Sequence, residues 1–184
     1  MSAVTSPETG FTLIEGIVAS LISVILVGVL LTILTMNNSG VKNGAINTQV
    51  QAQYEIAIEQ IAAAARKATA ILAGGETWPP TAGMAATTTS KIEMYYQDAV
   101  GNVTRIRGFK VDGGVLKECS SGFSDADYIP FKVGSWPALS VLDASPFTLT
   151  SNRKSVTVSM RVCGVFSGDS AIAPARGEVF TCRN

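Results

Sequence analysis

The sequence of 184 residues contains no histidine and only three cysteines. The lack of histidine removes the commonest general base and the commonest transition-metal ligand, and no nucleophile motif stands in its place. Cys119, Cys163 and Cys182 all lie in the second half of the chain and form no C-x-x-C pair. Outside the cytosol, one disulfide with one remaining thiol is the simplest arrangement; in the cytosol, we expect buried or free thiols. The composition therefore disfavours catalysis or metal binding that depends on histidine.

An excess of charge of either sign is also absent, because 14 basic residues balance 14 acidic ones. No basic block and no cluster of aromatic residues with arginine indicates a nucleic-acid surface. We therefore expect no direct nucleic-acid partner. The length allows one compact domain with an appendage and leaves little room for two domains.

A long apolar run lies near the N-terminus. Residues Gly16 to Met36 are 21 positions without a charge, and 13 of them are Leu, Ile or Val. A helix of this length, at about 1.5 Å per residue, crosses about 30 Å of hydrocarbon. The 13 branched residues contribute roughly −4 to −8 kcal/mol to insertion, whereas a carboxylate at the centre of a span costs about 2.5 to 3.5 kcal/mol. Membrane insertion is thus favoured although Glu15 precedes the run.

A cleaved secretory signal is a competing interpretation of this run. The run is longer than the apolar core of a typical signal peptide, no A-x-A site follows it, and the residues before it carry no positive charge. These features favour a spanning helix. Glu15 is then either an interfacial charge that marks the membrane boundary or a functional group with a specific partner.

The segment GFTLIE at residues 10–15, followed by the apolar run, resembles the processing site of type IV pilins and of the pseudopilins of type II secretion and DNA-uptake systems. The resemblance implies that a membrane prepilin peptidase cleaves after Gly10 and methylates the new N-terminus at Phe11. It also implies that Glu15 meets the amine of a neighbouring subunit during filament assembly. In a low-dielectric bundle, such a pair selects register more than it adds stability. The leader before the cleavage site departs from the family pattern because it contains no Lys or Arg.

The helix is expected to continue beyond the apolar run. Residues 37–44 are rich in residues that weaken a helix, so we expect a bend or a locally melted turn there. From Ala45 to Ala73, apolar residues recur every three or four positions, which predicts an amphipathic helix that ends at Gly74 and Gly75. The expected buried stripe, interpreted as ordinary core, consists of Ile46, Val50, Tyr54, Ala57, Ile61, Ala65, Ala68 and Leu72.

Beyond a connector that includes residues 78–80 and 85–90, short apolar runs alternate with turn residues. We expect strands at residues 91–97, 103–111, 115–119, 147–150, 156–162 and 178–182. These five or six strands, mostly antiparallel, would pack one face on the amphipathic helix. The sequence thus predicts an α+β fold, and this layout is also the pilin-like one that the resemblance implies. The expected segments are a leader at 1–10, a transmembrane or filament-core helix at 11–36, an amphipathic half at 37–73 and a β-rich head at 74–184.

The cysteines of the head are candidates for a structural disulfide. Alternation along residues 156–162 places Cys163 on the face of Arg161, away from the apolar residues, whereas Cys182 shares the parity of Phe180. Parity alone does not identify the bonded pair. Cys119, Cys163 and Cys182 therefore all remain candidates, and a structural bond is preferred to a reactive thiol.

Two acids in a loop of the head are candidates for calcium. Asp125 and Asp127 lie two positions apart and could offer oxygen ligands to Ca²⁺, but two acids make an incomplete site. A solvated loop is the simpler interpretation. Apart from this calcium candidate, we expect no cofactor.

The resemblance predicts a non-enzymatic structural subunit of a type IV pilus or a related secretion filament. The length and the ending FTCRN resemble a minor pilin or a J-type minor pseudopilin more than a major subunit. The expected partners are other pilin or pseudopilin subunits, the prepilin peptidase and an inner-membrane assembly platform. Before assembly the subunit would span the inner membrane once with its head outside the cytoplasm, and afterwards it would lie in a pilus or a periplasmic filament.

Two alternatives belong to other functional classes. One is a permanently membrane-anchored extracytoplasmic module whose head binds a ligand or a surface. The other is an anchored hydrolase, which the absence of histidine and of a nucleophile motif disfavours. Removal of residues 1–10 together with methylation of Phe11 would separate the filament subunit from the permanently anchored module.

Overall fold

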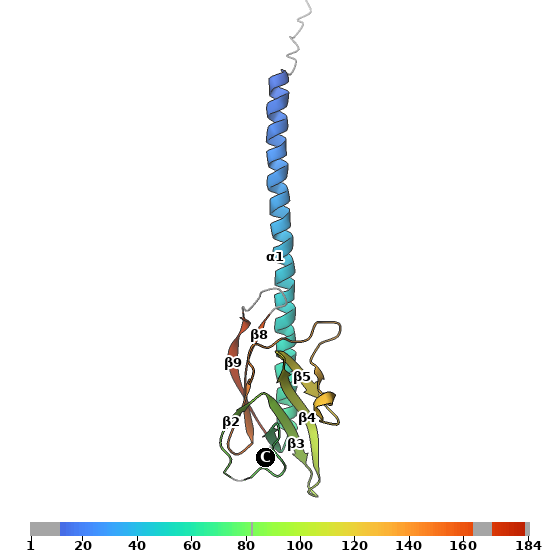
Figure 1. The fold of residues 1–184 in the computed structure, drawn as a ribbon, viewed down its shortest axis with the longest axis vertical. Helices are drawn as coiled ribbons and strands as arrows, with labels where there is room; N and C mark the ends of the chain where they lie inside the picture. Colours follow the sequence, from blue (N-terminus) through green and yellow to red (C-terminus); the bar gives the residue numbers. More distant parts are fainter. Residues whose placement is uncertain (1–11, 82, 164–170, 183–184) are drawn as a thin grey trace, which may run out of the picture. The chain divides into compact units, whose positions relative to one another are not determined.

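The computed structural model describes residues 12–81, 83–163 and 171–182 of the chain. A single long helix, α1 (Leu13–Lys67), precedes all the described strands (Figure 1). The chain divides after Gly44 into two units. The α+β class predicted from the sequence is confirmed.

The described part of the N-terminal unit is the first part of α1. Its large apolar side chains, from Leu13 to Met36, are exposed to solvent in the structure. Residues 37–44 remain helical, so the prediction of a locally melted turn is wrong. Each glycine here costs up to about 1 kcal/mol relative to alanine, but extending an existing helix requires no new nucleus.

The helix ends at Lys67 rather than at the predicted Ala73. Residues Ala70–Ala73 instead form strand β1, which pairs antiparallel with β3 (Lys91–Gln97). The prediction failed because Ala68 and Leu72 continue the four-residue step of the helical stripe. All four residues of β1 are buried, and a short apolar run of this kind also fits a strand that is covered on both faces.

Two antiparallel sheets follow the helix. The five-stranded sheet has the order β1-β3-β4-β5-β6, with β4 at Val103–Asp112, β5 at Val115–Cys119 and β6 at Ile129–Pro130. The four-stranded sheet has the order β2-β7-β8-β9, with β2 at Thr87–Thr89, β7 at Phe147–Leu149, β8 at Ser155–Cys163 and β9 at Ala171–Thr181. Figure 1 shows β8 and β9 on one side of the C-terminal part of α1, and β4 and β5 on the other.

The predicted strand bounds are confirmed for β3 and β5, and nearly so for β4, β7 and β8. The sequence did not predict β1, β2 or β6, and β9 begins earlier than expected. Strand β2 consists of three threonines, which the prediction assigned to a polar connector. Threonine is β-branched and favours an edge strand, and here it pairs with β7.

The core lies between the C-terminal part of α1 and the two sheets. The helix contributes the predicted stripe from Val50 to Ala65, which is buried as ordinary core, and Ala68 directly after the helix joins the same core. Alanines in this stripe allow both sheets to approach the helix closely. Large side chains that the strands bury in the same core cluster include Phe109, Leu116, Phe147, Leu149, Ile92 and Met94.

Backbone contacts also connect the five-stranded sheet with the region around β8. The Ile71 amide of β1 donates a hydrogen bond to the Arg153 carbonyl at 2.9 Å, next to β8. At another place, the Val141 amide donates to the Gly114 carbonyl at 2.8 Å, and Val141 also forms a bridge to Val162 of β8. Strand β1 therefore belongs to the five-stranded sheet and also bonds to the turn before β8, although it was predicted to belong to the helix.

Gly108 of β4 lies against the ring of Tyr128. A methyl group at Gly108 would come within 2.3 Å of the Tyr128 hydroxyl oxygen. We expect Gly108→Ala to lower the free energy of unfolding by about 1 to 3 kcal/mol, because overpacking must displace the ring. Chemical denaturation of the full chain in detergent micelles measures the change. In a Tyr128→Ala background the same substitution should have little effect, and an equal loss in both backgrounds would contradict the steric explanation.

Candidate functional site

Helix α1 begins with a reciprocal cap formed by Thr12 and Glu15. The amide and the hydroxyl of Thr12 donate to Oε2 of Glu15 at 3.2 and 3.1 Å, and the Glu15 amide lies 3.3 Å from Thr12 Oγ1, which accepts its hydrogen bond. Such a capping box satisfies backbone donors that a helix start otherwise leaves unpaired. The prediction for Glu15 did not include this cap, although T-x-x-E at residues 12–15 is its sequence signal.

The predicted cleavage and methylation positions, Gly10 and Phe11, lie outside the described residues. Glu15, the predicted assembly residue, is described and lies in the first turn of α1. The exposed side chains of Leu13 and Ile14 flank it. The structure therefore places the predicted carboxylate at the start of an exposed apolar helix.

The apolar part of α1 satisfies its own polar groups. The hydroxyls of Ser20, Ser23 and Thr32 donate to backbone carbonyls three or four residues earlier, at 2.8 to 2.9 Å. In lipid, backbone and side-chain polar groups must find partners within the protein. Within the described residues, α1 is the helix long and apolar enough to cross a membrane.

The two calcium candidates make contacts with the protein itself. Asp125 Oδ1 lies 3.2 Å from Lys110 Nζ and 3.5 Å from Lys91 Nζ. Asp127 Oδ2 accepts hydrogen bonds from the amide and hydroxyl of Ser124 at 2.7 and 2.6 Å. The hydrogen bond from Lys110 lowers the pKa of Asp125, and the one from the Ser124 hydroxyl lowers the pKa of Asp127. Among the described residues no third acid, Cys or His joins them into a metal-binding group.

The three cysteines are free thiols, so the predicted disulfide is not formed in the structure. Cys163 ends β8, whereas the Cys182 amide donates to the carbonyl of Lys154 at the opposite end of that strand, at 2.7 Å. The nine residues of β8 span roughly 26 Å, and a disulfide requires Cα atoms within about 7 Å. A bond between Cys163 and Cys182 is therefore excluded. The predicted parity is confirmed, because Cys182 is in the core and Cys163 is partly exposed.

Cys182 should be an unreactive thiol in the folded chain. Its side chain is buried, and desolvation raises its pKa to about 11 from the ordinary value of 9.0. Because the thiolate is the reactive form, we expect labelling at pH 8 to be about 100-fold slower than in the unfolded chain. A variant with Cys119→Ser and Cys163→Ser isolates this thiol for labelling and mass spectrometry. A folded-state labelling rate that levels off near pH 9 would show that Cys182 ionises normally.

A buried arginine that no sequence pattern indicated links the connector to the four-stranded sheet through hydrogen bonds. Arg153 lies in the turn between β7 and β8, has a φ of 55° and is 2 % exposed. Its Nε and Nη2 donate to the two oxygens of Glu76 at 3.0 and 2.5 Å, and Nη1 donates to the carbonyls of Ala85 and Thr150. Burial raises the pKa of Glu76, but hydrogen bonds from Arg153 and the Ala73 amide lower it below its ordinary value. We call this group the Arg153 clamp.

The five-stranded sheet carries a second charged group around Glu93, which is also buried. The Tyr95 hydroxyl donates to Glu93 Oε2 at 2.9 Å, and Lys91 Nζ and Arg105 Nε lie 3.1 and 3.4 Å from its two oxygens. Burial, together with the Glu93 carboxylate, raises the pKa of Tyr95 to about 12. The carboxylate is paired with two cations and a phenol, so this group is a structural ion-pair network.

The predicted site residues belong to different elements of the fold. Glu15 is at the start of α1, Asp125 and Asp127 are in the 3₁₀ turn η1 (Asp125–Asp127) before β6, and Cys182 is in the core. Comparison of the chain with protein-family models, with curated proteins and with solved structures finds no match. The function is therefore inferred from the residues of this chain.

Proposed function

We propose that this chain is a structural subunit of a type IV pilus or a related secretion filament, cleaved after Gly10 and assembled through α1. The observation that carries the proposal is the exposed apolar surface of α1 from Leu13 to Met36, headed by Glu15. Such a surface is stable in lipid or against other apolar helices, and unstable in water. The helix of a filament subunit occupies both environments in succession, first the membrane and then the filament core.

The cap at the start of α1 supports the role proposed for Glu15. The described contacts with Thr12 use Oε2 of the carboxylate. Oε1 can therefore accept a hydrogen bond from a further donor without breaking the cap. The N-terminal amine of a neighbouring processed subunit is a cationic donor of the required kind.

The proposed function implies which proteins the chain binds and where in the cell it is located. The partners are other pilin or pseudopilin subunits, a prepilin peptidase and an inner-membrane assembly platform. The layout of a helix followed by a β-rich head supports a subunit whose head is carried outside the membrane. The resemblance of the segment FTCRN to minor subunits supports a minor rather than a major component.

Co-expression with a prepilin peptidase tests the proposal. Mass spectrometry of the purified chain should find residues 1–10 removed and Phe11 methylated. A catalytically inactive peptidase is the matched control and should leave the chain intact. An intact leader in the presence of the active enzyme would overturn the proposal and favour a permanently anchored binding module.

A further inference from the structure

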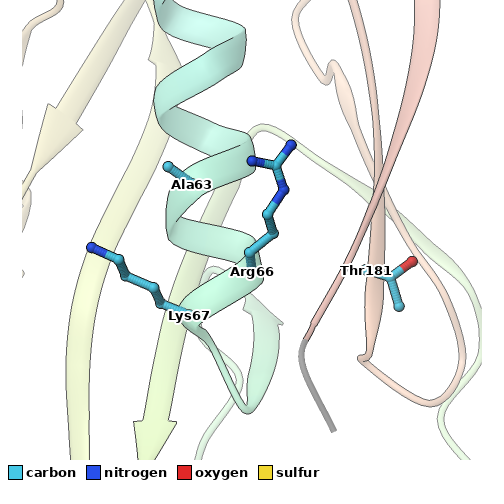
Figure 2. Close-up of a pocket in the computed structure, with 4 residues that line it drawn as sticks. All are labelled: Ala63, Arg66, Lys67 and Thr181. Carbon is cyan, nitrogen blue, oxygen red and sulfur yellow. The ribbon is translucent and has the colours of Figure 1, made fainter.

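An open groove runs between the C-terminal part of α1 and strand β9. Strand β9 is the last strand of the four-stranded sheet and pairs with β8 on one side. Two adjoining clefts, of about 290 and 540 Å³, lie along it, and Arg66 lines both. Figure 2 shows Arg66 on the side of α1 that faces the strand of Thr181. We call these two clefts and the adjoining edge of β9 the edge groove.

The backbone of β9 provides a template for a further strand. An edge strand directs every second pair of N–H and C=O groups away from its sheet. Natural edges are often blocked by proline or lysine, and β9 itself contains Pro174. The template is therefore limited to residues 177–181, which contain neither residue type. Glu178 and Phe180 face the helix, because they pair with the core residues Val158 and Val156. A strand added beside β9 would therefore point alternate side chains into the groove.

The charges of the edge groove are separated by sign. Glu55, Glu59 and Glu178 line one cleft, and Arg66 lies at its other end. Among the described residues none of these four charges forms an ion pair. Glu55 and Glu59 are four residues apart on α1, a spacing at which like charges repel. The groove thus presents an acidic end and a basic end to a partner.

The spacing of these charges fits an extended chain. From the midpoint of Glu55 and Glu59 to Arg66, the helix rises about 14 Å. Four steps of an extended strand also cover about 14 Å, and residues two and four apart share a face. One intermediate side chain would then lie over the apolar floor formed by Ile58, Ala62 and Phe180.

We propose that the edge groove binds an extended segment of another protein as an added antiparallel strand, with alternate residues that are acidic, apolar and basic. The acidic residue pairs with Arg66, the apolar one covers the floor, and the basic one meets the glutamates. The acidic residue comes first because β9 runs from Glu178 towards Thr181, and its antiparallel partner starts at the Arg66 end. Antiparallel pairing is the more stable arrangement per residue. The inference concerns the head and does not depend on the filament function.

Fluorescent peptides test the proposal with the full chain in detergent micelles. The probe is Thr-Asp-Thr-Val-Thr-Lys-Thr, and its binding is measured by fluorescence anisotropy. We expect saturable binding, and we expect the peptide with Asp and Lys exchanged, which has the same composition, to bind about fivefold more weakly. Two further probes carry N-methyl groups on alternate amides. One set of amides faces β9 and the other faces outward, so only one of these probes should lose binding.

Charge reversal in the protein provides a matched test. Arg66→Glu should weaken the original probe about fivefold or more, and a probe with Lys in place of Asp should recover that loss. Lys132→Glu makes the same charge change at an exposed residue outside the groove and should have no effect. If Arg66→Glu unfolds the chain, Arg66→Gln tests the same contact. Equal binding of all probes, no saturable binding, or self-association of the chain through β9 in place of peptide binding would each overturn the proposal.

Discussion

Replacing Arg153 with leucine is expected to lower the free energy of unfolding by about 3 to 5 kcal/mol, the range for breaking a buried ion pair from one side. The arginine is 2 % exposed and donates to both oxygens of Glu76. Without it, the Glu76 carboxylate and the carbonyls of Ala85 and Thr150 lose their donor in a site that admits little water. The connector would then lose its attachment to the turn between β7 and β8.

Denaturant titration of the full chain in micelles measures this effect. The double variant Arg153→Leu with Glu76→Leu should recover much of the loss, because it removes the stranded carboxylate as well. Arg161→Leu is the matched control. Arg161 pairs with Asp143 at 2.7 Å, but its side chain is half exposed, so solvent screens the pair and we expect a much smaller loss than for Arg153→Leu. Similar losses for Arg153→Leu and Arg161→Leu would show that the Arg153 clamp contributes no more than a surface pair.

Replacing Glu15 with alanine is expected to lower incorporation into filaments by at least about tenfold while leaving cleavage after Gly10 largely intact, because a neighbour's amine would enter the filament core unpaired. Alanine also removes the cap with Thr12, so two effects are combined. Glu15→Gln separates them, because glutamine can serve in a capping box but carries no charge.

The measurement is the amount of the chain in sheared filaments relative to the amount in membranes, in cells that also contain the assembly machinery. Both Glu15→Ala and Glu15→Gln should be deficient if the charge pairs with a neighbour. Full incorporation of Glu15→Gln with reduced incorporation of Glu15→Ala would assign the defect to the cap. Normal incorporation of both variants would show that Glu15 is an interfacial charge.

The sequence predicted an element correctly where its apolar residues follow a single repeat, every second residue in a strand or every third to fourth in a helix. Strands β3 and β5 alternate between turn residues and were predicted at their observed bounds. Strand β1 was not predicted, because its four apolar residues extend the helical step of α1. What ends the helix is a long-range contact, the pairing of β1 with β3 and with Arg153, and the local sequence does not contain that information.

The candidate site shows the same division between local and long-range information. The cap of Thr12 and Glu15 joins residues three apart and could have been predicted from T-x-x-E. The local sequence around Arg153 indicates only a solvent-exposed turn residue. Its burial could not be predicted, because its partner Glu76 is distant along the chain. Strand parity gave the faces of Cys163 and Cys182 but not their positions along β8, so it could not show that these two residues are too far apart to pair.

The short link between α1 and β1 is held by hydrogen bonds from two directions. Beyond Lys67, the Thr69 amide donates to the Tyr95 carbonyl of β3 at 2.6 Å, and the Thr69 carbonyl accepts from Lys154 Nζ at 2.8 Å. Tyr95 belongs to the five-stranded sheet, and Lys154 directly precedes β8 of the four-stranded one. The residue that follows the last turn of α1 by two positions is thus anchored both to the five-stranded sheet and to the residue that precedes β8, so the end of the helix is fixed from two sides.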